Sequence, residues 1–203
     1  MKKIQRCALL AAGMLCLTAC SGESSIAESS TPAAETQQDG ITLHTAEDVD
    51  TRYAETLKRY FDAINAKDYD AYLATVYPPY SEAYSAFLTE KGSSLEQAFA
   101  EMCTRFDEDG YESWKLTDLT VSYYKKETEY VQSDGISDYF SAYVKMGVLD
   151  EGFEETCRKN AEELRDVQFS LSALYAGDDA PVTVVSGQEI MMLIDKDGCW
   201  LFG

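Results

Sequence analysis

Few side chains in this sequence could transfer a proton during catalysis. The chain holds one histidine, His44, so the segment after it cannot build a Ser-His-Asp or Cys-His arrangement. Asp62 and Asp68 lie near aromatic residues, and a carboxylate buried among aromatic rings could have a pKa high enough for a general base. We favour a structural role for both: Asp62 on the solvated face of a helix, and Asp68 as the cap of the next helix. The sequence therefore predicts no catalytic residue and no cofactor.

Two acidic segments superficially resemble calcium loops. Asp107–Gly110 and Asp195–Gly198 each combine aspartates with a glycine, but neither supplies the spaced oxygens and the late glutamate that an EF-hand loop requires. We interpret both as turns and predict no metal site.

Tyrosine is the residue type with the greatest capacity for binding, because it joins apolar area to a polar hydroxyl. The chain has 14 tyrosines, and they are dense from Tyr53 to Tyr84. We name four of these as candidate binding residues: Tyr60, Tyr77, Tyr80 and Tyr84. Tyr77-Pro-Pro-Tyr80 forms a rigid corner, which could be a binding edge or ordinary packing at a helix break.

The amino-terminal segment has the organisation of an export signal. Lys2, Lys3 and Arg6 precede an uncharged run, 7–17, which is too short for a transmembrane helix of about 20 residues and fits a signal-peptide core. Leu17-Thr-Ala-Cys20 resembles the lipobox of bacterial lipoproteins. The resemblance implies that residues 1–19 are removed and that the Cys20 sulfur carries a diacylglycerol.

A lipidated Cys20 would anchor the protein to the cell membrane on its extracytoplasmic face, because two acyl chains hold a protein stably where one does not. The alternative is a plain secretory peptide cut near Ala19. Outside the membrane a disulfide is permitted. One could join two of Cys103, Cys157 and Cys199, or all three could be buried free thiols, and the sequence does not choose between these alternatives.

Charge and composition exclude some classes of partner. The chain of 203 residues has 17 basic and 36 acidic residues, a formal net charge of −19. Such a surface repels a phosphate backbone, so we predict no nucleic-acid partner. A hydrophobic content of 45% allows a buried core. Residues 20–46, rich in Ser, Thr, Ala, Glu and Gln, read as a disordered tether, and 47–203 as one domain.

Hydrophobic periodicity in the domain changes from helical to alternating. The expected helices are 49–64 after a capping box at 45–48, 69–76 before two prolines, a turn or two closed by Gly92, and 95–106 after a Ser94 cap. The expected strands are 114–132 with a bulge at Asp118, 167–175, and a hairpin over 182–202 that turns at 195–198. A helical stretch, about 134–166, interrupts the strands. This order predicts an α+β fold with helices packed on one face of a curved antiparallel sheet.

Two phrases resemble the NTF2-like superfamily. One is the helix that breaks and restarts over 60–72, and the other is the closing hairpin over 192–202 with its Asp-Gly-x-Trp pattern. The resemblance covers about 47–203 and implies a cone in which a bent sheet wraps a long helix and leaves an apolar mouth. The stretch 134–166 is a departure from the family pattern, and this helical insertion could cap or fill the mouth.

The superfamily includes enzymes, ligand carriers and interaction modules, so the resemblance leaves the function open. We expect a non-catalytic domain that binds a small molecule, a peptide or an envelope protein. One alternative is an isomerase or dehydratase that uses an Asp–Tyr pair, which requires an acid deep in an open cavity. The other is a scaffold without a pocket.

Overall fold

The structure is a computed structural model that describes residues 40–123 and 135–202. The chain divides into two units, 1–37 and 38–203, and the described residues belong to the second. Cys20 and most of the predicted tether lie outside the described residues. So does the part of the predicted strand 114–132 that follows Tyr123.

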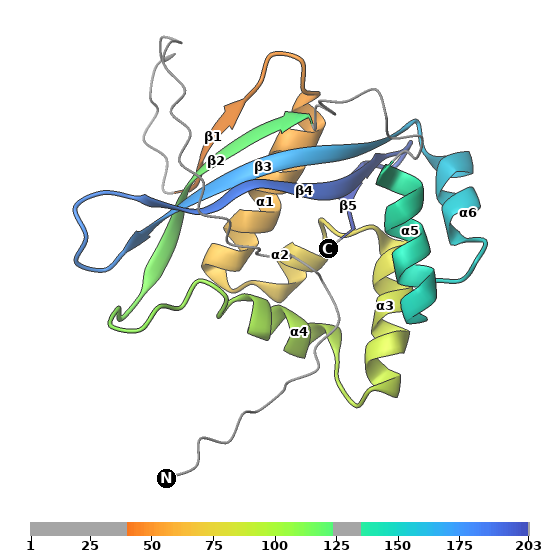
Figure 1. The fold of residues 1–203 in the computed structure, drawn as a ribbon, viewed down its shortest axis with the longest axis horizontal. Helices are drawn as coiled ribbons and strands as arrows, with labels where there is room; N and C mark the ends of the chain where they lie inside the picture. The colour runs from red at the N-terminus through yellow and green to blue at the C-terminus, as the bar shows by residue number, and fades with distance from the viewer. Residues whose placement is uncertain (1–39, 124–134, 203) are drawn as a thin grey trace. The chain divides into compact units, whose positions relative to one another are not determined.

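One strongly curled sheet carries the fold (Figure 1), and its five strands follow one another in chain order. The strands are β1 Thr42–Thr45, β2 Trp114–Tyr123, β3 Glu163–Tyr175, β4 Val182–Ile194 and β5 Cys199–Leu201. The last four pair antiparallel, whereas β1 pairs with β2 in parallel. The sheet is therefore mixed, which corrects the purely antiparallel sheet that we expected.

Helices cover the sheet, and the α+β class is confirmed. They are α1 Thr51–Ala66, α2 Tyr69–Leu73, α3 Pro78–Glu90, α4 Leu95–Met102, α5 Gly135–Met146 and α6 Phe153–Asn160. Figure 1 shows α1 lying across the curled strands, with α3, α5 and α6 gathered at one end of the sheet. Such a curled sheet around a long helix is consistent with the cone expected from the NTF2-like resemblance.

Alternation along β3 builds much of the core. Every second residue from Val167 to Tyr175 is buried, as predicted. On the facing helix, α1, buried side chains recur at helical spacing, and the rings of Phe61 and Phe169 lie 5.1 Å apart between their centroids. The amphipathic helix and the alternating strand thus bury their apolar faces against each other.

The predicted capping box at 45–48 is wrong. Thr45 ends β1, where it pairs with Val121, and α1 begins only at Thr51. Asp50 caps this helix, since its carboxylate accepts a 2.9 Å hydrogen bond from the Arg52 amide. β1 also lies inside the segment predicted as tether, because pairing along the edge of β2 draws these residues into the sheet.

The break after α1 follows the prediction. Lys67 adopts the left-handed conformation, and Asp68 caps α2 by accepting a 3.0 Å hydrogen bond from the Ala71 amide. Asp62 lies on the outer face of α1, where it pairs with Lys58 at 2.6 Å and accepts a hydrogen bond from the Ile41 amide. Neither aspartate is buried among aromatic rings.

The helical insertion consists of α5 and α6. From α5, Phe140 meets Phe202 edge to face at 5.5 Å, and Tyr143 meets Tyr80 of α3 at 5.8 Å. The insertion therefore supplies part of the aromatic core between α3 and the chain that follows β5. It ends earlier than the predicted 166, because β3 already begins at Glu163.

Candidate functional site

The four tyrosines named as candidate binding residues all lie in the core. Their exposed fractions are 4% for Tyr60, 5% for Tyr77, 0% for Tyr80 and 5% for Tyr84. The Tyr60 hydroxyl is 3.0 Å from the sulfur of Met102, and the Tyr77 ring packs on Phe202. Tyr77 and Tyr80 of the corner that starts α3 face inward and have a packing role, whereas Pro78 and Pro79 between them are exposed. The part of the four tyrosines in binding stays a prediction.

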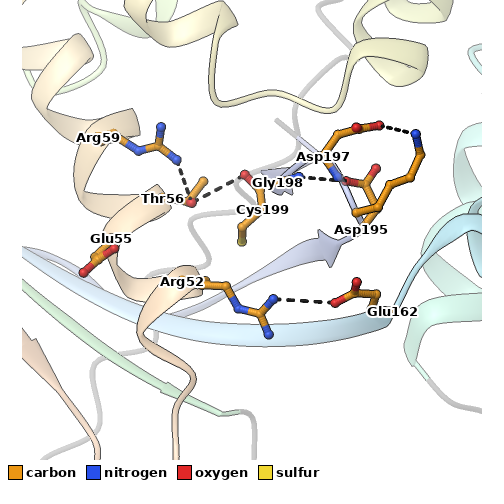
Figure 2. A pocket seen from close by; sticks show the side chains of 10 residues that line it. Arg52, Glu55, Thr56, Arg59, Glu162, Asp195, Asp197, Gly198 and Cys199 are labelled. Carbon is orange, nitrogen blue, oxygen red and sulfur yellow. Dashed lines mark hydrogen bonds and ion pairs between the residues drawn. The ribbon is translucent and has the colours of Figure 1, made fainter.

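A groove of about 410 Å³ lies elsewhere, between α1 and the turn that joins β4 to β5 (Figure 2). Its lining residues are Arg52, Glu55, Thr56, Arg59, Glu162, Asp195, Lys196, Asp197, Gly198 and Cys199. A volume of this size suits a small-molecule site. We did not predict this groove from the sequence. The one local signal was the pair Arg52 and Arg59, seven residues and so about two helical turns apart on the polar face of α1.

Thr56 forms the buried base of the groove. Its side chain is 1% exposed, and its hydroxyl donates to the Cys199 carbonyl at 3.4 Å. The same oxygen accepts a 3.0 Å hydrogen bond from Nη2 of Arg59. One hydroxyl therefore ties α1 to β5 and fixes the position of a guanidinium at the surface (Figure 2).

The turn that forms the opposite wall is held by one carboxylate oxygen. Oδ1 of Asp195 accepts hydrogen bonds from the amides of Asp197 and Gly198 and from Nε1 of Trp200, at 2.8, 2.9 and 3.1 Å. A side chain at Gly198 would lie 3.2 Å from the Trp200 ring, so a residue without a side chain fits there. Asp195–Gly198 is thus the turn that the sequence predicts.

Arg52 is neutralised by its neighbours. Its guanidinium forms two-pronged contacts with Asp50, with a shortest distance of 2.8 Å, and reaches Glu162 at 3.7 Å. The hydrogen bonds from Arg52 hold the pKa of Asp50 below its usual value, and those to Asp50 raise the pKa of Arg52. Both groups therefore stay charged at neutral pH, and Arg52 has little free charge to offer.

Unlike Arg52, Arg59 is not neutralised by a carboxylate of the described residues. In the parts of the chain that the structure describes, it forms no ion pair, and its one side-chain hydrogen bond goes to Thr56. Lys196 contacts Asp197 at 3.4 Å on the exposed rim. Glu55 is exposed and is turned away from the Arg59 guanidinium in Figure 2.

The groove also borders the buried thiol of Cys199. Burial raises the pKa of Cys199 to about 11, so its sulfur stays protonated at neutral pH. Cys103, Cys157 and Cys199 are all buried and free, which is one of the two alternatives that the sequence left open.

The remaining candidates form no larger constellation. His44 lies on β1, where Nε2 is 3.5 Å from Oδ1 of Asp118, and both side chains are well exposed. Within residues 40–123 and 135–202, no three His, Cys, Asp or Glu side chains are grouped as metal ligands would be. Over the same residues, none of the helices has the length and apolar character that crossing a bilayer requires.

Comparison with known proteins gives no match to a family model, a curated protein or a solved structure. The comparisons therefore assign neither a family nor an activity. The NTF2-like resemblance rests on the two sequence phrases and on the curled α+β fold.

Proposed function

We propose that this chain is a lipid-anchored, extracytoplasmic binding protein with an NTF2-like head. In this proposal Cys20 carries the acyl chains, the following segment is a tether, and the folded unit binds a small polar molecule or a polar segment of an envelope protein. The lipobox supports the anchor, and the helix-covered, curled sheet supports the family assignment. Neither nucleic acid nor a cofactor enters the proposal.

The groove between α1 and the β4–β5 turn is the observation that carries the binding role. Hydrogen bonds to the backbone hold Thr56 at its base and Asp195 in its far wall. Its guanidinium at Arg59 has donors that no described carboxylate occupies. A preformed recess with an oriented polar group is what a small ligand needs. A scaffold without a pocket would not need one.

The alternative of an Asp–Tyr isomerase or dehydratase has no comparable support. Apart from tyrosines and cysteines, the buried polar side chains of the described residues belong to Thr56 and Thr75, so none of the described carboxylates lies in the core. A general base of this type works because burial raises the pKa of its carboxyl group. We therefore propose binding without catalysis.

Mass spectrometry tests the anchor. The full chain is expressed in a bacterial host, and the amino-terminal peptide of the membrane fraction is analysed. We expect a chain that begins at Cys20 and carries a diacylglyceryl group, while Cys20→Ala yields no acylated form. An exported chain with an intact and unmodified segment 1–20 would overturn the anchor.

Thermal shift measurements test the groove. The full chain is screened against amino acids, dipeptides, sugars and sugar phosphates. We expect at least one of these probes to raise the melting temperature, and the increase to disappear in Arg59→Gln. Arg165→Gln is the matched control, because Arg165 is an exposed arginine of β3 outside the groove. Stabilisation that is unchanged by Arg59→Gln would place binding elsewhere.

A further inference from the structure

The guanidinium of Arg59 is oriented before any ligand arrives. Nη2 donates to the Thr56 hydroxyl, and Thr56 is itself buried and bonded to the Cys199 carbonyl. A guanidinium has five N–H donors in a rigid fork, so the bond to Thr56 leaves most of them available. Because the fork is held in place, a ligand that pairs with it orders little additional side chain.

Apart from Glu55, the other charged side chains of the groove are already paired or hydrogen-bonded. Arg52 pairs with Asp50 and Glu162, and the Asp195 carboxylate holds the turn. Lys196 faces Asp197 at the exposed edge. Arg59 is therefore the cation of the groove that an incoming anion can reach without displacing a carboxylate of the described residues.

The surrounding charge limits the kind of anion. Three basic and four acidic side chains line the groove, and the whole chain has a formal charge of −19. A doubly charged phosphate would meet this negative field at twice the cost of a singly charged group. A carboxylate has one charge, and its two oxygens match the spacing of the guanidinium donors.

On the basis of the proposed binding function, we propose that the groove takes a ligand with a single carboxylate, such as a peptide carboxy terminus, and that Arg59 pairs with that carboxylate. Thr56 is the positioning residue, because its hydroxyl holds the guanidinium of Arg59 in place. Glu55 of the same helix lies nearby and adds a negative charge that opposes the anion.

The test uses two matched probes on the full chain: N-acetyl-L-alanyl-L-alanine and its carboxy-terminal amide, which differ only in the charged group. Binding is followed by the ¹⁵N NMR resonance of the arginine Nε groups and by titration. We expect the acid to shift one arginine resonance and the amide to shift none. Arg59→Gln should weaken binding of the acid about tenfold or more, since a charge-assisted pair is lost. Arg165→Gln should leave binding unchanged.

Two further variants sharpen the result. Arg59→Lys keeps the charge but loses the fork, so binding of the acid should fall between that of the wild type and that of Arg59→Gln. Glu55→Gln removes the opposing negative charge and should therefore tighten binding of the acid. Both residues are exposed, so these changes leave the core intact.

The carboxylate assignment is overturned if the amide binds as well as the acid, if inorganic phosphate binds more tightly than the acid, or if Arg59→Gln has no effect. It is also overturned if the acid does not bind at all. In that case a neutral or basic probe that still depends on the groove in the thermal screen would leave the proposed function standing, so the two failures can be told apart.

Discussion

The side chain of Asn65 satisfies both backbone hydrogen-bonding groups of Leu116. Its Oδ1 accepts from the Leu116 amide at 2.8 Å, and its Nδ2 donates to the Leu116 carbonyl at 2.9 Å. Leu116 lies on the edge of β2 before the point where β1 begins to pair, next to the bulge between Leu116 and Asp118. One amide at the end of α1 thus takes the place of a strand partner and fixes the helix to the sheet.

Replacing Asn65 should therefore cost more than its partly exposed position suggests. Asn65→Ala leaves the amide and carbonyl of a buried residue without partners, and we expect a loss of about 2–4 kcal/mol in the free energy of unfolding. Asn65→Asp keeps the acceptor but loses the donor, so this variant should recover stability at low pH, where its carboxyl group is protonated and can donate. Urea unfolding at two pH values checks both. A loss below about 0.5 kcal/mol for Asn65→Ala would contradict the role.

Lys67 offers a stabilising substitution. It has φ of 53° and is the one non-glycine residue with positive φ in the described ranges. Glycine adopts this conformation without a steric penalty, so Lys67→Gly should raise the free energy of unfolding by about 0.5–1 kcal/mol. Lys91→Gly is the matched control, because Lys91 also ends a helix but has φ of −88°. Equal effects of the two substitutions in urea unfolding would contradict the argument.

Phe202 should be a critical core residue. Its ring lies 5.4–6.0 Å from the rings of four others. They are Tyr77, Tyr80, Tyr139 and Phe140. Phe202→Ala leaves a cavity between α3 and α5 and should lower the free energy of unfolding by about 3–5 kcal/mol, and Phe202→Leu by less. Tyr111→Ala, at an exposed aromatic, is the control and should change it by under about 1 kcal/mol. Calorimetry checks the order of the three variants.

The three cysteines of the folded unit should not react with thiol reagents in the native protein. Cys103, Cys157 and Cys199 are 3%, 1% and 8% exposed, so a thiol reagent such as Ellman's should react with them only after denaturation. Each of the three should then titrate as a free thiol without a reductant. If two fewer thiols than expected react in the denatured chain, two of these cysteines form a disulfide.

The same thiols predict a loss of stability at alkaline pH. Burial raises the pKa of Cys199 to about 11 and that of Cys157 to about 12, whereas in the unfolded chain both return to about 9. Above about pH 9 the unfolded thiols ionise first and favour unfolding, and the loss is complete once the pH passes the raised values. Stability measured from pH 8 to 11 should fall less steeply in Cys157→Ala and Cys199→Ala than in the wild type. Equal slopes would contradict the assignment.

Local sequence signals predict those elements whose determinants are close together in the chain. Ser94 and Asp68 are caps as expected, because capping needs only a side chain and an amide three residues on. The bulge near Asp118 and the alternation of β3 are also confirmed, since each is a break or a continuation of a two-residue period.

Features that depend on distant partners could not be predicted in this way. β1 has four residues and becomes a strand only because β2 lies beside it. Tyr80 ends a proline-containing corner that is typical of an exposed site, yet its ring packs against Tyr143 of α5, far along the chain. The groove requires Arg59 to face a turn some 140 residues away, and Asn65 shows no local sign of its bond to Leu116.

The parallel pairing of β1 with β2 determines which edge of the sheet should open first. Thr42 meets Asp118 only after the intervening chain has closed into a long loop, and the entropy of that closure is offset by a ladder of four residues. The first spontaneous opening of the sheet should therefore occur at this edge, where amide protons exchange with solvent fastest. The remaining strands are joined by antiparallel pairing and should exchange only when the whole unit unfolds.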